Sequence, residues 1–184
     1  MTTTYIILGI VVALILWLIL SYNRLITLRN RALEALSDID VQLKRRYDLI
    51  PNLVEAVKGY MTHERGGLEN VTKARAAVSQ NSGNPIERAK SENMLSDTLK
   101  TLFAVAENYP DLKASVNFLE LQRELSDTEN KIQASRRFYN TTVMDLNTTI
   151  QTFPTNIIAK PFSFKEEAFF DARETEEQPV KVQF

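Results

Sequence analysis

The chain has 184 residues, enough for one domain with a hydrophobic core, and its 5 glycines and 6 prolines leave few turns, which favours an all-α fold. Its 22 Lys and Arg residues nearly balance 23 Asp and Glu, which excludes the broadly basic surface of a nucleic-acid-binding protein. It has no cysteine, which excludes disulfides, zinc–thiolate sites and a cysteine nucleophile.

An apolar stretch near the N-terminus predicts a transmembrane helix over residues 5–22, YIILGIVVALILWLILSY. As a helix these 18 residues span roughly 27 Å, close to the ~30 Å hydrocarbon core of a bilayer. Tyr5 and Tyr22 end the stretch with amphipathic rings, while the only tryptophan, Trp17, lies further inside it. A cleaved signal peptide is disfavoured, because no Lys or Arg precedes the stretch and no small-residue cleavage site follows it.

The charges beside this stretch predict its orientation. Arg24, Arg29 and Arg31 follow it, and positive charge is retained on the cytosolic side of a membrane. We therefore expect residues 1–4 to be a short extracytoplasmic N-terminus and the chain after Tyr22 to be cytosolic.

Beyond the span, apolar residues recur at helical spacing and predict a helix that continues the membrane helix: Leu25, Ala32, Leu36, Ile39 and Leu43. Residues 48–51 are expected to kink or reverse this helix, because Pro51 lacks an amide donor and clashes with the preceding turn. The apolar spacing then resumes and keeps its phase across Gly66 and Gly67, which predicts one helix through both glycines: Val54, Val57, Met61, Leu68, Val71 and Val78.

A third helix is predicted to start at Asn84, Pro85 and Glu87, which supply an N-cap, a first-turn proline and an N3 glutamate. Pro110 is expected to stop it. Its apolar residues form the least regular stripe: Ala89, Leu95, Leu99, Leu102, Phe103 and Ala106.

The last long helix, over residues 112–151, carries the most regular stripe, a coiled-coil-like seam. One row is large and one is small and hydroxylated, which favours close antiparallel packing of a neighbouring helix. The large row is Phe118, Leu125, Ile132, Tyr139, Leu146 and Phe153, and the small row is Thr128, Ser135, Thr142 and Thr149. Asn140 and Asn147 flank the seam and are predicted to satisfy buried backbone groups or to fix register.

An apolar segment punctuated by proline, FPTNIIAKPFSF, follows this helix from Phe153 onward. Two roles remain open for it: it caps the end of the bundle, or it docks on a neighbouring subunit. Residues 161–184 form a C-terminal acidic tail that we expect to be peripheral and partly mobile.

Five blocks of the sequence resemble the LemA family: RRYDLIPNLVEAVKGY, LENVTKARAA, ENYPDLKAS, RFYN and FPTNIIA, which begin at Arg45, Leu68, Glu107, Arg137 and Phe153. The resemblance implies a membrane-anchored, up-and-down (antiparallel) four-helix bundle of long helices, in a bacterial inner (cytoplasmic) membrane. It implies a turn between helices at residues 48–51 and a LemA-like bundle over residues 23–160. It implies no reaction, because the family has no agreed biochemical activity.

The blocks also supply candidate structural or interaction residues: Tyr47, Asp48, Pro51, Asn52, Tyr109, Pro110, Tyr139, Asn140, Phe153, Pro154 and Asn156. No catalytic, cofactor-binding or metal-binding residue is predicted. His63, the only histidine, stands beside Glu64 without a second ligand cluster, which favours a solvated helix residue over a metal or acid–base pair. The tail carboxylates lack the ligand spacing of a calcium loop.

The basic run Lys44, Arg45 and Arg46 could contact anionic headgroups, but a straight helix places it roughly 30 Å beyond Tyr22. A solvated or interhelical ion-pair cluster is therefore favoured.

These patterns favour a membrane-anchored scaffold or interaction protein that self-associates as a homo-oligomer. Its expected partners are the lipid bilayer, other copies and an unidentified membrane or cytosolic protein. A membrane-remodelling or envelope-stress signalling module is the alternative, and an enzyme is the third hypothesis.

Overall fold

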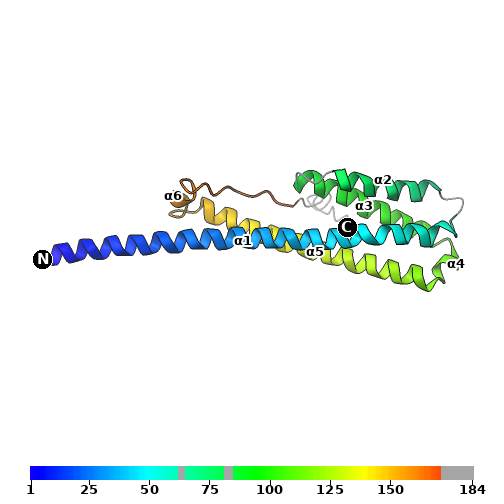
Figure 1. The fold of residues 1–184 in the computed structure, drawn as a ribbon, viewed down its shortest axis with the longest axis horizontal. Helices are drawn as coiled ribbons and strands as arrows, with labels where there is room; N and C mark the ends of the chain where they lie inside the picture. The colour runs from blue at the N-terminus through cyan, green and yellow to red at the C-terminus, as the bar shows by residue number, and fades with distance from the viewer. Residues whose placement is uncertain (62–64, 81–84, 171–184) are drawn as a thin grey trace, which may run out of the picture. The chain divides into compact units, whose positions relative to one another are not determined.

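The computed structural model describes residues 1–61, 65–80 and 85–170, and every regular element among them is a helix. This confirms the predicted all-α class. The elements, labelled in Figure 1, are α1 (Thr2–Lys58), α2 (Arg65–Gln80), α3 (Pro85–Ala106), α4 (Pro110–Lys113), α5 (Val116–Gln151) and α6 (Asn156–Ala159).

The chain divides into two compact units. Unit 1 comprises Met1–Ser37 and Arg137–Phe169, and unit 2 comprises the described residues of Asp38–Arg136 together with Phe170. The helices α1 and α5 each contribute residues to both units.

Helix α1 runs without a break through Pro51 to Lys58, so the predicted turn at residues 48–51 is wrong. The prediction of a turn weighed the amide that proline lacks and the clash with the preceding turn, but not a group from another helix that could replace the amide. Proline also leaves the carbonyl four residues earlier without its helical partner, and a helix can continue where another group satisfies that carbonyl. Here the guanidinium Nε of Arg75, on α2, donates to the carbonyl oxygen of Tyr47 at 3.2 Å.

The break falls after Lys58 instead, where the amides of Tyr60 and Met61 both bond to the carbonyl of Val57 at 3.0 and 3.1 Å. The prediction of one helix from Val54 to Val78 is therefore also wrong. Apolar residues on two helices that meet across a turn can keep the same spacing as on one helix, so phase alone did not reveal the break. Gly66 and Gly67 lie in the first turn of α2, while His63 and Asn84 lie outside the described residues.

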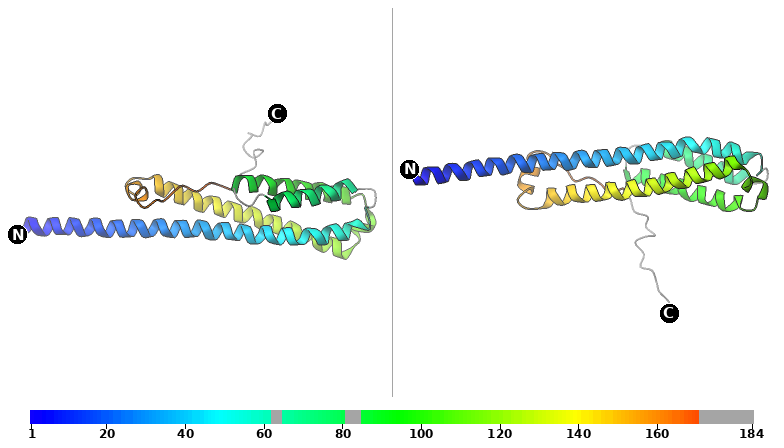
Figure 2. Two further views of the ribbon diagram at one scale, coloured as in Figure 1. Left: turned by 45° about the horizontal axis from the view of Figure 1, so that its top comes forward. Right: turned by 90° about the horizontal axis from the view of Figure 1, so that it is seen from below.

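The core of unit 2 draws on all four long helices and the short α4. Its buried members include Ile50 and Leu53 from α1, Val71 from α2, Leu102 from α3 and Phe118 from α5. Helices α2 and α3 lie side by side in both views of Figure 2.

The large row of the α5 seam is buried from Phe118 through Leu146, as its period predicted. Phe153 departs from the row and is 75% exposed, because α5 ends at Gln151 and the helical phase is lost. The start of the helix also differs: α4 is a separate turn, and α5 begins at Val116 rather than at Leu112.

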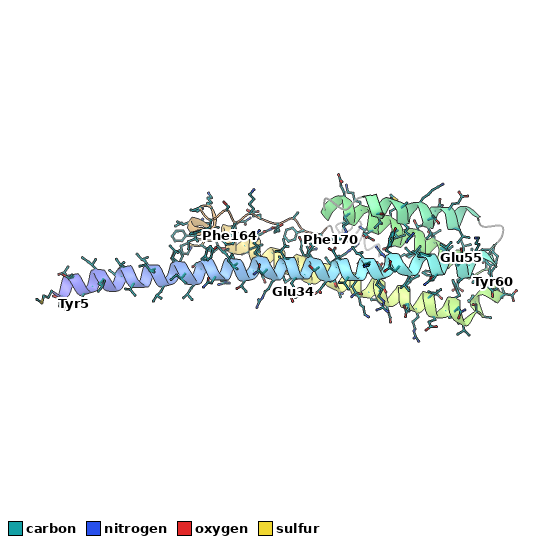
Figure 3. All side chains as sticks on the ribbon, viewed as in Figure 1. Tyr5, Glu34, Glu55, Tyr60, Phe164 and Phe170 are labelled. Atoms are coloured by element: carbon teal, nitrogen blue, oxygen red, sulfur yellow. The ribbon has the colours of Figure 1, made fainter. Side chains whose placement is uncertain are left out.

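The core of unit 1 joins α1 to the segment that follows α5. Leu25, Ile158 and Ala159 are buried together, and Trp17 and Phe164 pack against them. Figure 3 shows Phe164 on this segment beside α1. Most of the described part of the predicted tail, residues 161–170, is exposed, whereas Phe164 is half-buried and Phe170 is buried in unit 2. Residues 171–184 lie outside the described residues.

One helix in the described ranges, α1, is long and apolar enough to cross a membrane. None of the residues in its most apolar window is buried. This property separates it from the core helix of a soluble protein, whose apolar side chains pack inside the molecule.

Candidate functional site

A buried cluster of charged side chains joins three helices of unit 2. The Arg46 side chain on α1 is 1% exposed, and it contacts Glu92 and Ser96 on α3 and Glu129 on α5. Its Nη1 donates to Ser96 Oγ at 2.6 Å and to Glu129 Oε2 at 2.7 Å. Its Nη2 forms an ion pair with the Glu92 carboxylate, whose side chain is 2% exposed. The Ser96 hydroxyl in turn donates to Glu129 Oε2 at 3.0 Å.

The electrostatics of this cluster favour one arrangement of the three helices. Burial by itself raises the pKa of Glu129, but the charge of Arg46, hydrogen bonds from Ser96 and Gln133 and the charge of Arg136 together hold that pKa below its ordinary value. Burying a charge is costly unless it is paired and hydrogen-bonded. A shift of any one helix would separate a buried charge from its partner, so the cluster favours this register of α1, α3 and α5 within unit 2.

The sequence analysis did not single out this cluster, although a signal for it was present. Arg46 lies between Leu43 and Ile50 on the apolar stripe of α1, and Glu129 lies between Leu125 and Ile132 on that of α5. Charges of opposite sign at core positions of two helices indicate a buried pair. The ion-pair interpretation of the basic run is nevertheless correct for two of its members: besides Arg46, Arg45 lies 3.5 Å from Glu124 on α5, while Lys44 is exposed.

A second interaction in unit 2 surrounds the candidate residues Tyr47 and Pro51. The Arg75 guanidinium lies 3.7 Å from the centre of the Tyr47 ring, in addition to its bond to the Tyr47 carbonyl. The Arg75 side chain therefore contacts the Tyr47 ring and also bonds to the Tyr47 carbonyl, which lacks a helical partner because Pro51 has no amide proton.

The other candidates in unit 2 do not join this interaction. Asp48, Asn52 and Pro110 are exposed, and Tyr109 is half-buried against the core. They do not form a single site with Tyr47.

In unit 1 the candidate Tyr139 helps to hold the chain that follows α6. Its hydroxyl donates to the carbonyl of Ala168 at 2.9 Å, and burial together with the charge of Glu167 raises its pKa, which keeps the hydroxyl protonated. Asn147 pairs with both backbone groups of Glu167 at 2.9 Å, so it does bond to backbone groups, although these groups are exposed rather than buried as predicted. Asn140 is half-buried on the same helix.

The last candidates lie at the other end of this segment. Pro154 and Asn156 are half-buried, and Phe153 is exposed. Beyond them the rings of Phe162 and Phe164 meet Tyr22 edge to face, with centroids 5.0 and 5.7 Å apart. The segment therefore packs on the first helix of its own chain.

The contacts described in the two units position and pack helices against one another. No group of three His, Asp or Glu side chains within them could hold a metal ion. Arg46, Ser96 and Glu129 also line a surface pocket of about 460 Å³ whose walls include Phe103 and Leu119. These three polar side chains already bond to one another, so the pocket is mainly a feature of the packing between α3 and α5.

Comparison with known proteins places the chain in a family. The model of the LemA family matches residues 35–184. The chain is 31% identical over 161 residues to Protein LemA of Metamycoplasma hominis, an alignment that covers 86% of this chain and 72% of that protein. It is also 23% identical over 194 residues to the magnetosome protein MamQ of Magnetospirillum gryphiswaldense, covering 92% and 71% of the two chains. Magnetosome protein MamQ 2 of Paramagnetospirillum magneticum is 24% identical, with 92% and 72% covered. This chain belongs to the LemA family.

Proposed function

We propose that the protein is a membrane-anchored helical scaffold. Residues 5–22 of α1 cross a bacterial inner membrane, and the remaining helices form an up-and-down antiparallel bundle in the cytosol. The scaffold self-associates and binds a membrane or cytosolic protein, and it catalyses no reaction.

The observation that carries this proposal is the character of α1. Its first part is apolar on every face and unburied, whereas its later part buries one regular stripe that includes Ile39, Leu43 and Ile50. A helix that is apolar all round needs lipid or a large protein core, and a helix with one apolar stripe needs a packed neighbour. One unbroken helix therefore suits both environments, as expected of an anchor that continues directly into the scaffold. Membership of the LemA family and the likeness to magnetosome proteins fit such an anchored protein.

The proposed topology follows from the arginines after Tyr22 and is tested with reporters on the full chain. A fluorescent protein that matures only in the cytosol should be active when fused after Phe184, and a phosphatase that needs an oxidising compartment should be inactive there. Extraction of the chain from membranes by alkaline carbonate would contradict the anchor, and an active phosphatase would reverse the topology.

Self-association draws its support from the anchor. Confinement to a membrane raises the effective concentration of neighbouring copies, so weak contacts suffice. Leu33 on α1 and Phe138 on α5 are 51% and 55% exposed in unit 1 and offer apolar contact area. Helix α5, with 36 residues, is longer than α3, with 22, and the excess length could suggest a partner from another copy. It does not, because Tyr139 and Leu146, on the part of α5 in unit 1, are buried within one chain.

The oligomer is tested by measuring the particle mass of the full chain in mild detergent and in nanodiscs over a wide concentration range. We expect more than one copy per particle, and fewer copies for Leu33→Glu and Phe138→Glu. Glu34→Gln, an exposed neighbour, is the matched control. A single copy at every concentration would contradict self-association.

The second candidate is a membrane-remodelling or envelope-stress signalling module, in which assembled copies shape or sense the bilayer. The similarity to proteins named for the magnetosome favours it. Vesicles that carry the full chain should then change in diameter or shape as its density rises. Unchanged vesicles at densities where copies associate would leave the scaffold as the better account.

A further inference from the structure

The segment after α5 lies at the level where the apolar part of α1 ends. Among residues 5–20 of that part, Trp17 alone is half-buried, and it packs with Leu25, Ile158 and Ala159. Tyr22, the last residue of the apolar stretch, meets the rings of Phe162 and Phe164. Figure 2 shows α6 beside α1 in both views.

The depth of this contact follows from helical geometry. At 1.5 Å per residue, Leu25 stands only about 4.5 Å beyond Tyr22, while each headgroup region of a bilayer is roughly 5–8 Å thick. Ile158 and Ala159 are buried in one cluster with Leu25, and Trp17 packs against that cluster, so the two residues are held within the headgroup layer or at its inner edge. A segment packed on these residues cannot stay clear of a bilayer that residues 5–22 span.

The outward side chains of the segment fit that layer. Phe153, Ile157 and Phe162 are 75%, 61% and 52% exposed, although the same segment buries Ile158 and Ala159. Exposed Lys160 lies between Ile157 and Phe162 in the sequence, and exposed Arg24 follows Tyr22 on α1. Apolar side chains interspersed with cations are typical of segments that lie in the plane of a membrane interface and pair with anionic lipids. The carboxylates of the segment, Glu166 and Glu167, come after the aromatic residues in the chain.

The geometry points to a second membrane contact: residues 153–164 lie in the headgroup region, with Phe153, Ile157 and Phe162 inserted toward the acyl chains and Lys160 at the lipid phosphates. This inference rests on the proposed anchoring of the chain by α1. The contact brings the end of α5 to the bilayer as well, so two elements of unit 1 rather than one would hold it to the membrane.

Labelling tests this contact directly, because the chain contains no cysteine of its own. Single variants Ile157→Cys and Phe162→Cys of the full chain, in vesicles that contain anionic lipid, are labelled with an environment-sensitive fluorophore. Lipids with a nitroxide near the headgroup then act as quenchers. We expect quenching several-fold stronger than at Val116→Cys, a control at an apolar residue of unit 2 that is more exposed than either labelled position.

A further variant separates failure of this inference from failure of the anchor. Ile10→Cys, in the middle of the apolar stretch, should be quenched by nitroxides placed deep in the acyl chains. If Ile10→Cys is quenched while Ile157→Cys and Phe162→Cys behave like Val116→Cys, the second membrane contact is wrong and the anchor stands. If Ile10→Cys is not quenched, the anchor itself is wrong.

A second copy of the chain is the competing occupant of this surface. Fluorophores at Ile157→Cys and Phe162→Cys that are shielded from lipid nitroxides, and whose emission changes with protein density at fixed lipid composition, would assign the surface to a subunit contact and overturn the inference. Emission and quenching that do not change with protein density support the lipid contact.

Discussion

The two units differ in the kinds of side chain that they bury. The buried polar and charged residues of the described chain are Arg46, Ser91, Glu92, Ser96 and Thr128 in unit 2, against Thr142 in unit 1. Unit 1 instead fixes its last segment through the Tyr139 hydroxyl and the Asn147 amide, which bond to backbone groups. Unit 2 thus specifies its packing with ion pairs, and unit 1 specifies it with apolar contacts and neutral hydrogen bonds.

This difference predicts how much a substitution of a polar side chain destabilises each unit. Paired buried charges contribute little net stability, but removal of one partner exposes the full cost of burying the other. Neutral bonds at a half-exposed edge cost far less when they are lost, because water replaces the missing partner. We therefore expect substitutions of the polar side chains to destabilise unit 2 strongly and unit 1 weakly.

The largest effect is expected where a charge enters the apolar seam that both units share. Ile132→Asp in unit 2 and Tyr139→Asp in unit 1 should each lose about 4 kcal/mol or more of the free energy of unfolding, because both side chains are buried. Circular dichroism of the full chain in detergent, followed with temperature, measures this loss. Ala134→Asp and Thr141→Asp, at exposed neighbours, are the controls, and unchanged unfolding of the seam variants would show that α5 is not core.

The ion cluster should give the next largest effect. Arg46→Met leaves Glu92 and Glu129 without their cation, and we expect a loss of about 3–5 kcal/mol in the same thermal assay. Arg45→Met removes a largely exposed pair and should cost at most about 1 kcal/mol. Replacement of Glu92 and Glu129 by leucine in addition to Arg46→Met should recover stability. If Arg46→Met were as stable as Arg45→Met, the buried ion pairs would not distinguish unit 2 from unit 1.

The contact that allows α1 to continue past proline is expected to be worth less. Arg75→Ala removes both the bond to the Tyr47 carbonyl and the contact with its ring, at a cost of about 1–2 kcal/mol. In a Pro51→Ala background the new amide can satisfy that carbonyl, so the cost of Arg75→Ala should fall by about 1 kcal/mol. Equal costs in the two backgrounds would mean that Arg75 acts only through the Tyr47 ring.

Loss of the contact between Asn147 and Glu167 in unit 1 should have a local effect rather than a global one. Asn147→Ala removes two bonds to Glu167, and we expect about 1 kcal/mol or less in global unfolding. Amide hydrogen exchange around residues 165–168 should nevertheless accelerate clearly. Thr148→Ala, an exposed neighbour, serves as the control, and unchanged exchange would mean that Tyr139 alone holds the segment.

The smallest effect is a dependence on pH. The pKa of Glu129 in the folded chain lies below its ordinary value of 4.5, so the folded state binds fewer protons than the unfolded state between these two values. Its stabilising contribution is complete above about pH 5 and is lost as the pH falls through the folded pKa. The melting temperature of the wild-type chain should therefore fall more steeply below pH 4.5 than that of Glu129→Gln. Parallel curves would exclude this carboxylate as the source.

Much of the fold was determined by the sequence alone. Low glycine and proline content, the unbroken apolar stretch and the three- and four-residue steps of α5 are local properties, and they correctly predicted an all-α chain and the buried residues from Phe118 to Leu146. The LemA family membership was likewise readable from ordered blocks of residues.

The tertiary structure decided what depends on partners distant in the sequence. Whether Pro51 ends a helix depends on whether another group satisfies the Tyr47 carbonyl, and that group belongs to Arg75 on a different helix. Whether Arg46 is a surface charge depends on Glu92 and Glu129, which lie 46 and 83 residues away. A local pattern records what one residue prefers, but the free energy of a free carbonyl or a buried charge is set by the group that packing brings beside it.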